Sequence, residues 1–156
     1  MTEVGQKAPD VQLVDTEKKL VKISDFKGKT TVLLFFPGAF TGTCTKEMCA
    51  FRDEISKYNN LNANVVGISV DSPFALKAFK SANNLSFTLL SDFPRNAINS
   101  YGVPLNDFAG IVGYTTSKRS VFVLDKDQNV RFKWVSDNPG VEPDYAVVAK
   151  ETEKAR

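Results

Sequence analysis

Two cysteines, Cys44 and Cys49, are the residues of this chain with the clearest potential for chemistry. They lie in the segment FFPGAFTGTCTKEMCAFRDE, where an apolar run ends in a Pro/Gly loop and a helical pattern begins. Cys44 falls in the first turn of the predicted helix, where free N–H groups and the positive end of the helix dipole favour a thiolate. Thr41 lies three residues earlier, within reach of the sulfur or of a bound oxygen. We expect a reactive thiolate at Cys44; the alternative is a small buried core residue.

Cys49 follows Cys44 by five residues. In an ideal helix the two side chains point roughly 140° apart, and their Cα atoms are about 8–9 Å apart. A disulfide spans at most about 7 Å between Cα atoms. The two cysteines therefore bond only if the helix unwinds locally, and the spacing leaves open whether Cys49 is a redox partner or idle.

Composition excludes several classes of site and partner. The 156 residues include no histidine, so the chain alone builds no Ser-His-Asp triad, Cys-His pair or His-ligated zinc site. We expect no metal and no cofactor. The net charge of +2, from 20 basic and 18 acidic residues, argues against binding to nucleic acid or to a membrane. Without an apolar signal segment, a run of roughly 18–20 apolar residues or a disulfide framework, the sequence predicts a soluble cytoplasmic protein.

Hydrophobic periodicity predicts the elements that must position the cysteines. Continuous apolar runs at 31–36 and 65–70 indicate central strands that are covered on both faces. Amphipathic patterns predict helices at 44–58, 73–82, 94–101 and 143–154. Further strands are expected at 10–14, 20–23, 86–90, 120–125 and 130–135, with an irregular stretch at 102–118. The order predicts one α/β domain over residues 1–156: a thioredoxin-like three-layer sandwich with a central mixed sheet, helices on both faces and an N-terminal hairpin extension.

The string PGAFTGTC resembles the peroxiredoxin signature P-x-x-x-[TS]-x-x-C, with Pro37, Thr41 and Cys44 at the fixed positions. The likeness extends through GQKAPDVQL, CAFRD, GISVDS, LLSD and SKRSVFVLD, which is nearly the whole chain. It implies a thiol peroxidase that reduces hydrogen peroxide and organic hydroperoxides. The chain as a whole resembles the bacterioferritin-comigratory and alkyl hydroperoxide reductase-like branches. The cysteine spacing is similar to the bacterioferritin-comigratory branch, whereas GAFTGTC and LLSD are more like one-cysteine relatives.

The resemblance also implies a role for each matching residue. Cys44 matches the peroxidatic cysteine, and Thr41 matches the hydroxyl that orients sulfur and peroxide. Pro37 matches the proline that shields the pocket, and Arg119 the arginine that supports the thiolate. The implied product is a Cys44 sulfenic acid, which either Cys49 resolves as an intramolecular disulfide or an external thiol attacks directly. A thioredoxin-like dithiol or another thiol is the implied reductant, and relatives include both monomers and homodimers.

The expected peroxide pocket has a polar and an apolar part. Backbone N–H groups of Gly42, Thr43 and Cys44 are expected to bind the peroxide oxygens and to stabilise the charge on the leaving oxygen. Phe40 is either a core residue or, with residues of the 102–118 stretch, a wall of a pocket that favours organic peroxides.

Charged side chains on the predicted helix have two interpretations. Glu47, Arg52 and Asp53 are expected to be solvated or locally paired, and the resemblance offers Glu47 or Arg52 as a residue that positions Arg119. Two other functions compete with the peroxidase. One is a thioredoxin-like protein disulfide oxidoreductase, although that chemistry calls for C-x-x-C rather than C-x-x-x-x-C. The other is a flavodoxin-like or thioredoxin-like binding module with two inert cysteines.

Overall fold

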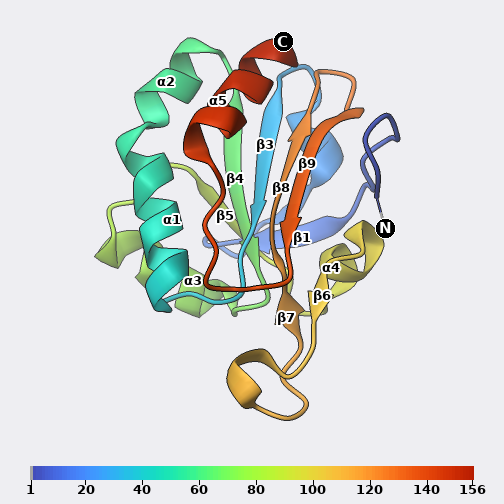
Figure 1. Ribbon diagram of the computed structural model, residues 1–156. Helices are drawn as coiled ribbons and strands as arrows, with labels where there is room; N and C mark the ends of the chain where they lie inside the picture. The colour runs from blue at the N-terminus through green and yellow to red at the C-terminus, as the bar shows by residue number, and fades with distance from the viewer. Residues whose placement is uncertain (1) are drawn as a thin grey trace.

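A seven-stranded sheet forms the middle layer of the computed structural model, which describes residues 2–156 (Figure 1). The strand order is β2-β1-β5-β4-β3-β8-β9. The strands are β1 (Gln12–Asp15), β2 (Leu20–Lys22), β3 (Thr31–Phe35), β4 (Asn64–Ser69), β5 (Thr88–Ser91), β8 (Arg119–Leu124) and β9 (Val130–Ser136). β3, β4 and β5 are parallel, whereas β1 and β8 run antiparallel to their neighbours β5 and β3. The sheet is therefore mixed, as the sequence predicts.

Helical segments cover both faces of the sheet. One face is covered by α1 (Gly42–Asp53), α2 (Ile55–Asn60), α3 (Pro73–Ala82) and α5 (Tyr145–Lys154). The other is covered by α4 (Asn96–Tyr101) and the 3-10 turn η1 (Ile23–Phe26). Leu34 of β3 faces the first group and Phe35 faces the second, because successive strand side chains point to opposite faces. This confirms the predicted three-layer α/β architecture.

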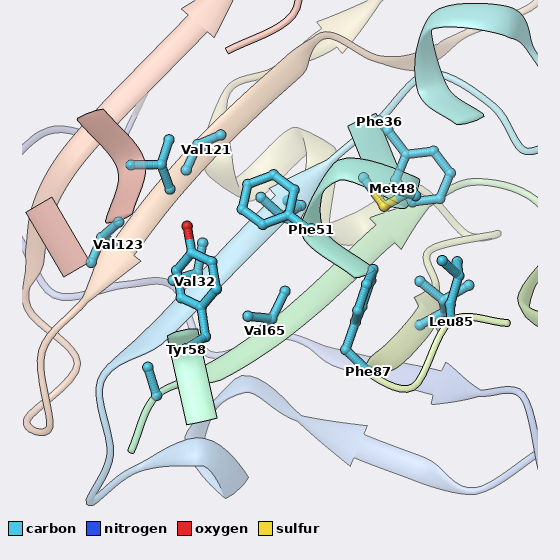
Figure 2. Close-up of a cluster of buried hydrophobic side chains, with 14 of the residues drawn as sticks. Val32, Phe36, Met48, Phe51, Tyr58, Val65, Leu85, Phe87, Val121 and Val123 are labelled. Carbon is cyan, nitrogen blue, oxygen red and sulfur yellow. The ribbon is translucent and has the colours of Figure 1, made fainter. Parts of the chain in front are cut away.

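The packing of α1 and α2 on the sheet holds the cysteine-bearing helix in place. Met48 and Phe51 of α1 and Tyr58 of α2 lie against strand side chains such as Val32 and Val65 (Figure 2). The three helical side chains are at most 1% exposed. Full burial of a side chain of this size contributes about 1.5–3 kcal/mol. The apolar face of α1 therefore anchors the helix that carries Cys44.

The single helix expected at 44–58 is divided in two, so that expectation is wrong at one point. α1 ends at Asp53 and α2 begins at Ile55. Glu54, between them, has φ −104° and ψ 10°, outside the helical range. Neither proline nor glycine marks the position, so the break has no local sequence signal.

The last helix begins at Tyr145 rather than at Pro143. Asp144 caps it, since its carboxylate accepts the N–H of Val147 at 3.2 Å, and a capping carboxylate precedes the first helical residue. The stretch 102–118 holds β6 (Pro104–Leu105), the 3-10 turn η2 (Phe108–Gly110) and β7 (Thr116–Ser117). The other elements agree with the prediction within about two residues at each end, the usual uncertainty of boundaries.

The small β6–β7 sheet and η2 lie at the same end of the molecule as the start of α1 (Figure 1). Segments far apart in the sequence therefore lie at this end of the molecule (Figure 1). No helix within residues 2–156 has the length and apolar character needed to cross a membrane.

Candidate active site

Cys44 is held in the first turn of α1, just beyond the end of the central strand β3. The buried Pro37 and Gly38 lead the chain out of the strand. Phe40 adopts a left-handed backbone with φ 64°, which is uncommon for a bulky residue. Thr41 is the extended N-cap residue, and Cys44 is the third residue of the helix. The strand–loop–helix position predicted for Cys44 is confirmed.

Asp71 fixes the loop that leads to Cys44. Its Oδ2 accepts the backbone N–H of Ala39 at 2.8 Å and the hydroxyl of Ser69 at 2.6 Å. Asp71 follows β4, the parallel neighbour of β3, and carboxyl ends of parallel strands meet at one edge of a sheet. No local sequence feature links Asp71 to this loop, because the contact joins two neighbouring strands that are far apart in the sequence.

Arg119 joins the Cys44 sulfur to a buried carboxylate. Its Nη2 donates to Cys44 Sγ at 3.2 Å and its Nη1 donates to Glu47 Oε1 at 2.8 Å. All three side chains are at most 1% exposed. Arg119 begins β8, the antiparallel neighbour of β3, so the sheet places it beside the start of α1. The guanidinium and the sulfur, which the family resemblance implied as one site, are in contact.

The charges of this cluster act on one another at close range. Burial raises the pKa of Glu47 to about 7, although the Arg119 charge opposes the rise. Glu47 Oε2 has no hydrogen-bond partner among residues 2–156. Burial lowers the pKa of Arg119, but the Cys44 sulfur and the Glu47 carboxylate outweigh it, and the net pKa is above the usual value. The guanidinium is therefore a permanent positive charge that favours an anionic sulfur.

Glu47 corrects one expectation about the helix surface. The sequence predicted a solvated or locally paired carboxylate, whereas Glu47 is buried and contacts Arg119. The alternative, that Glu47 positions Arg119, agrees with this geometry. Arg52 pairs locally with Asp53 at 2.9 Å, as expected.

A pocket of about 200 Å³ opens beside Arg119, lined by Thr41, Gly42, Thr43, Phe108, Arg119, Pro139 and Gly140. Pockets for drug-sized ligands run to about 300–1,000 Å³, so this one suits a small molecule. Phe108 of η2 forms its aromatic wall. Phe40 is 59% exposed, so a core position for it is wrong. It lies edge-on to Phe79 and is not among the lining residues.

Thr41 lines the pocket, and its side chain does not cap α1. Its hydroxyl donates to the Gly38 carbonyl at 2.7 Å, and its side chain makes no cap bond to the helix. The oxygen lone pairs of Thr41 are thus available as acceptors, and Thr41 leaves the first-turn N–H groups to a ligand. Pro37 is buried beside this loop but does not line the pocket.

The segment between β9 and α5 supplies part of the site that the sequence did not indicate. The Pro139 carbonyl accepts Arg119 Nη2 at 2.7 Å, and Gly140 lines the pocket. A Pro-Gly pair predicts a turn, but no local signal tells which site the turn covers.

Cys49 lies outside the pocket. It is half-buried on α1, its Sγ is 3.6 Å from Asn83 Oδ1, and both cysteines are free thiols. Among residues 2–156 no group of three or more Cys, Asp or Glu side chains is arranged to hold a metal ion.

Comparison with known proteins agrees with this geometry. The AhpC/TSA family matches residues 4–133. Chloroplastic peroxiredoxin Q of Populus jackii is 43% identical over 122 residues, which are 78% of this chain and 55% of that protein. A Coxiella burnetii protein named as a bcp peroxiredoxin is 39% identical over 132 residues, 85% of this chain and 87% of that protein. The chain spans little more than half the length of the plant relatives.

Solved structures show the same relationship over almost the whole chain. Peroxidoxin BcpB from Mycobacterium tuberculosis matches with a TM-score of 0.84 and 29% identity, covering 99% of this chain and 98% of that one. A peroxiredoxin-like protein from Aquifex aeolicus matches with a TM-score of 0.87 and 26% identity, covering 99% and 88%. A thiol at a helix start, an arginine at its sulfur and these likenesses together identify the chain as a member of the AhpC/TSA family of peroxiredoxins.

Proposed function

We propose that this chain, as one domain over residues 1–156, is a thiol-dependent peroxidase that reduces hydrogen peroxide and small organic hydroperoxides. The observation that carries the proposal is the 3.2 Å contact of Arg119 with Cys44 Sγ in the first turn of α1, beside a pocket of about 200 Å³. A buried cation next to a thiol at a helix N-terminus favours the thiolate, which is the nucleophile. The pocket volume sets the size of peroxide that fits.

In the first step the Cys44 thiolate attacks one oxygen of the peroxide. A sulfur–oxygen bond forms, the oxygen–oxygen bond breaks, and the leaving alkoxide or hydroxide takes up one proton. The products are a Cys44 sulfenic acid and an alcohol or water, so sulfur is oxidised and peroxide reduced. No cofactor is required for this balance.

Groups that line the pocket act on the peroxide oxygens. The Thr41 oxygen accepts the peroxide O–H, since its own proton is donated to the Gly38 carbonyl at 2.7 Å. First-turn N–H groups at Gly42 and Thr43, with the Arg119 guanidinium, stabilise the charge on the leaving oxygen. Pro37 shields the loop from behind, and Phe108 rather than Phe40 contacts the organic group of a hydroperoxide.

In the second step Cys49 captures the sulfenic acid. Its thiol replaces the hydroxyl on Cys44, and an intramolecular disulfide and water form. A thioredoxin-like dithiol then reduces the disulfide by exchange, and is itself oxidised. The competing function, a protein disulfide oxidoreductase, is not favoured by the family, and the two cysteines do not have its C-x-x-C spacing.

Peroxide consumption with a thioredoxin system tests the nucleophile. Cys44→Ser is expected to abolish turnover, because a serine hydroxyl does not ionise near neutral pH. Cys49→Ser, the same replacement on the same helix, is expected to form one sulfenic acid, trapped by dimedone, and to lose turnover with the dithiol. Peroxidase activity in Cys44→Ser would contradict the proposal. Full turnover in Cys49→Ser would instead assign resolution to an external thiol.

We also propose that the protein is located in the cytoplasm and that it is a homodimer or a monomer. Both cysteines are free thiols, as the cycle needs in a reducing compartment, while several plant relatives are named as chloroplastic. We propose neither nucleic-acid nor membrane partners. Sedimentation of the purified chain at micromolar concentration distinguishes the monomer from the homodimer.

A further inference from the structure

Asn83, at the C-terminal end of α3, holds the side chain of Cys49. Its Oδ1 accepts the Cys49 thiol at a sulfur–oxygen distance of 3.6 Å. Its Nδ2 donates to the Phe79 carbonyl at 3.0 Å, which orients the amide so that Oδ1 faces α1. Asn83 is the C-cap of α3. The thiol of Cys49 is therefore held by a group that is itself fixed to another helix.

Arg52 makes a second contact with the same residue. It follows Cys49 by three positions on α1, and residues at this spacing lie on one side of a helix. Its Nη1 donates to the backbone carbonyl of Asn83 at 2.9 Å, while its Nε pairs with Asp53 at 2.9 Å. Two neighbouring positions of α1 are thus tied to Asn83, one by a weak thiol bond and one by a charge-assisted bond.

These contacts oppose the movement that resolution requires. With α1 intact, Cys44 and Cys49 are about 8–9 Å apart at their Cα atoms and point roughly 140° apart, beyond the reach of a disulfide. Cys44 is 1% exposed beside Arg119, whereas Cys49 faces Asn83. Cys49 must therefore leave Asn83, and the turn of α1 that bears it must unwind, before the two sulfurs meet.

We propose that Asn83 and Arg52 form a latch that holds Cys49 away from Cys44 and sets the rate of disulfide formation. The proposal rests on the resolving role of Cys49. Two reactions compete for the Cys44 sulfenic acid. In one, the Cys49 thiol displaces its hydroxyl to give disulfide and water. In the other, a second peroxide transfers one oxygen to give a sulfinic acid and an alcohol or water. A tighter latch slows the first reaction and favours the second.

Single-turnover mass spectrometry of the whole chain tests the latch. Reduced protein receives one equivalent of hydrogen peroxide, is quenched at intervals, and the sulfenic acid and disulfide masses are followed. Arg52→Ala and Asn83→Ala each remove one of the two latch contacts, so each is expected to form the disulfide about three- to tenfold faster, the factor for one net hydrogen bond. Both are expected to accumulate less sulfinic acid in excess peroxide. The rate of sulfenic acid formation is expected to stay unchanged.

Two further variants separate a latch from a general loss of stability. Arg52→Lys keeps a donor for the Asn83 carbonyl and is expected to return the rate toward that of the parent protein. Lys57→Ala removes an exposed positive charge on α2 that pairs with Glu54, and is expected to have no effect. If either Arg52→Ala or Asn83→Ala fails to fold, the other still tests the latch, because each removes a different contact.

The outcomes distinguish the latch from the proposed function. Parent and latch variants that form the disulfide at one rate would overturn the latch and leave Cys49 as the resolving residue. Equal acceleration in Lys57→Ala would also overturn it, since a general charge effect would then explain the result. A parent protein that forms no intramolecular disulfide would refute the resolving role of Cys49, and the latch with it.

Discussion

Replacement of Glu47 by glutamine tests the charge arrangement around Arg119. The Glu47 carboxyl is buried, and burial raises its pKa to about 7 from the ordinary 4.5. Because the pKa is higher in the folded protein than in the unfolded chain, protonated Glu47 favours the folded state. This contribution is fully present below pH 4.5 and is lost as the pH rises through 7. Glutamine has no such titration.

The magnitude follows from the two pKa values. A rise from 4.5 to about 7, at about 1.4 kcal/mol per pKa unit, corresponds to about 3 kcal/mol in the free energy of unfolding. Glutamine keeps an oxygen that accepts Arg119 Nη1, which bonds Glu47 Oε1 at 2.8 Å in the parent. The substitution therefore changes the charge with little change in volume.

Urea unfolding at several pH values between 4.5 and 8 measures this effect. Both proteins carry Cys44→Ser, which removes the thiol beside Arg119. We expect the protein with Glu47 to lose about 3 kcal/mol relative to Glu47→Gln over this range. Glu153→Gln, at an exposed position on α5, serves as the control with an unchanged profile. Parallel profiles with and without Glu47 would refute the raised pKa and the argument built on it.

Three other substitutions test the pocket and the sheet. Thr41→Val removes the oxygen that faces the peroxide, and we expect kcat/KM to fall by about 10²–10³. Thr41→Ser is expected to retain activity. Equal activity in the two variants would exclude a role for the hydroxyl in the reaction. Phe108→Ala is expected to raise the KM for an aromatic hydroperoxide severalfold and to leave the KM for hydrogen peroxide unchanged. An unchanged KM for both substrates would exclude a contact between Phe108 and the organic group. In Gly67→Ala the added Cβ would meet Leu89 Cδ2 at 2.6 Å, so we expect a loss of about 1–3 kcal/mol in urea unfolding; undiminished stability would contradict this close packing.

The local sequence pattern predicted the elements whose consecutive residues share the same burial or the same end signal. β3 and β4 are buried on both faces, and their apolar runs show this directly. α3 begins at Pro73 after the Ser72 cap, which is a strong local signal. The approach to Cys44 through a Pro/Gly loop was equally clear. Such features depend on neighbours in sequence, so a single sequence reveals them.

Features that depend on distant partners were not predictable in the same way. Glu47 resembled a solvated helix charge, because its compensating cation, Arg119, comes from a strand 72 residues away. The Pro139 carbonyl bonds the same guanidinium from the segment before α5. The break at Glu54 and the exposure of Phe40 also lack a local cause. A sequence predicts which side chains carry charge, but only the fold decides which charges meet.

The buried cluster is best understood as a site that gives up stability for orientation. Replacing buried ions by apolar residues of similar volume is often neutral or stabilising, and Glu47 Oε2 without a partner among residues 2–156 adds to the cost. Glu47 nevertheless holds Arg119 Nη1 at 2.8 Å, which leaves Nη2 directed at Cys44 Sγ. An apolar residue at position 47 would remove the Nη1 bond, and the guanidinium would then be oriented less tightly toward the sulfur. The role of the Glu47 carboxylate is therefore to orient Arg119. A cation that is held facing one sulfur stabilises the thiolate more than a mobile cation does.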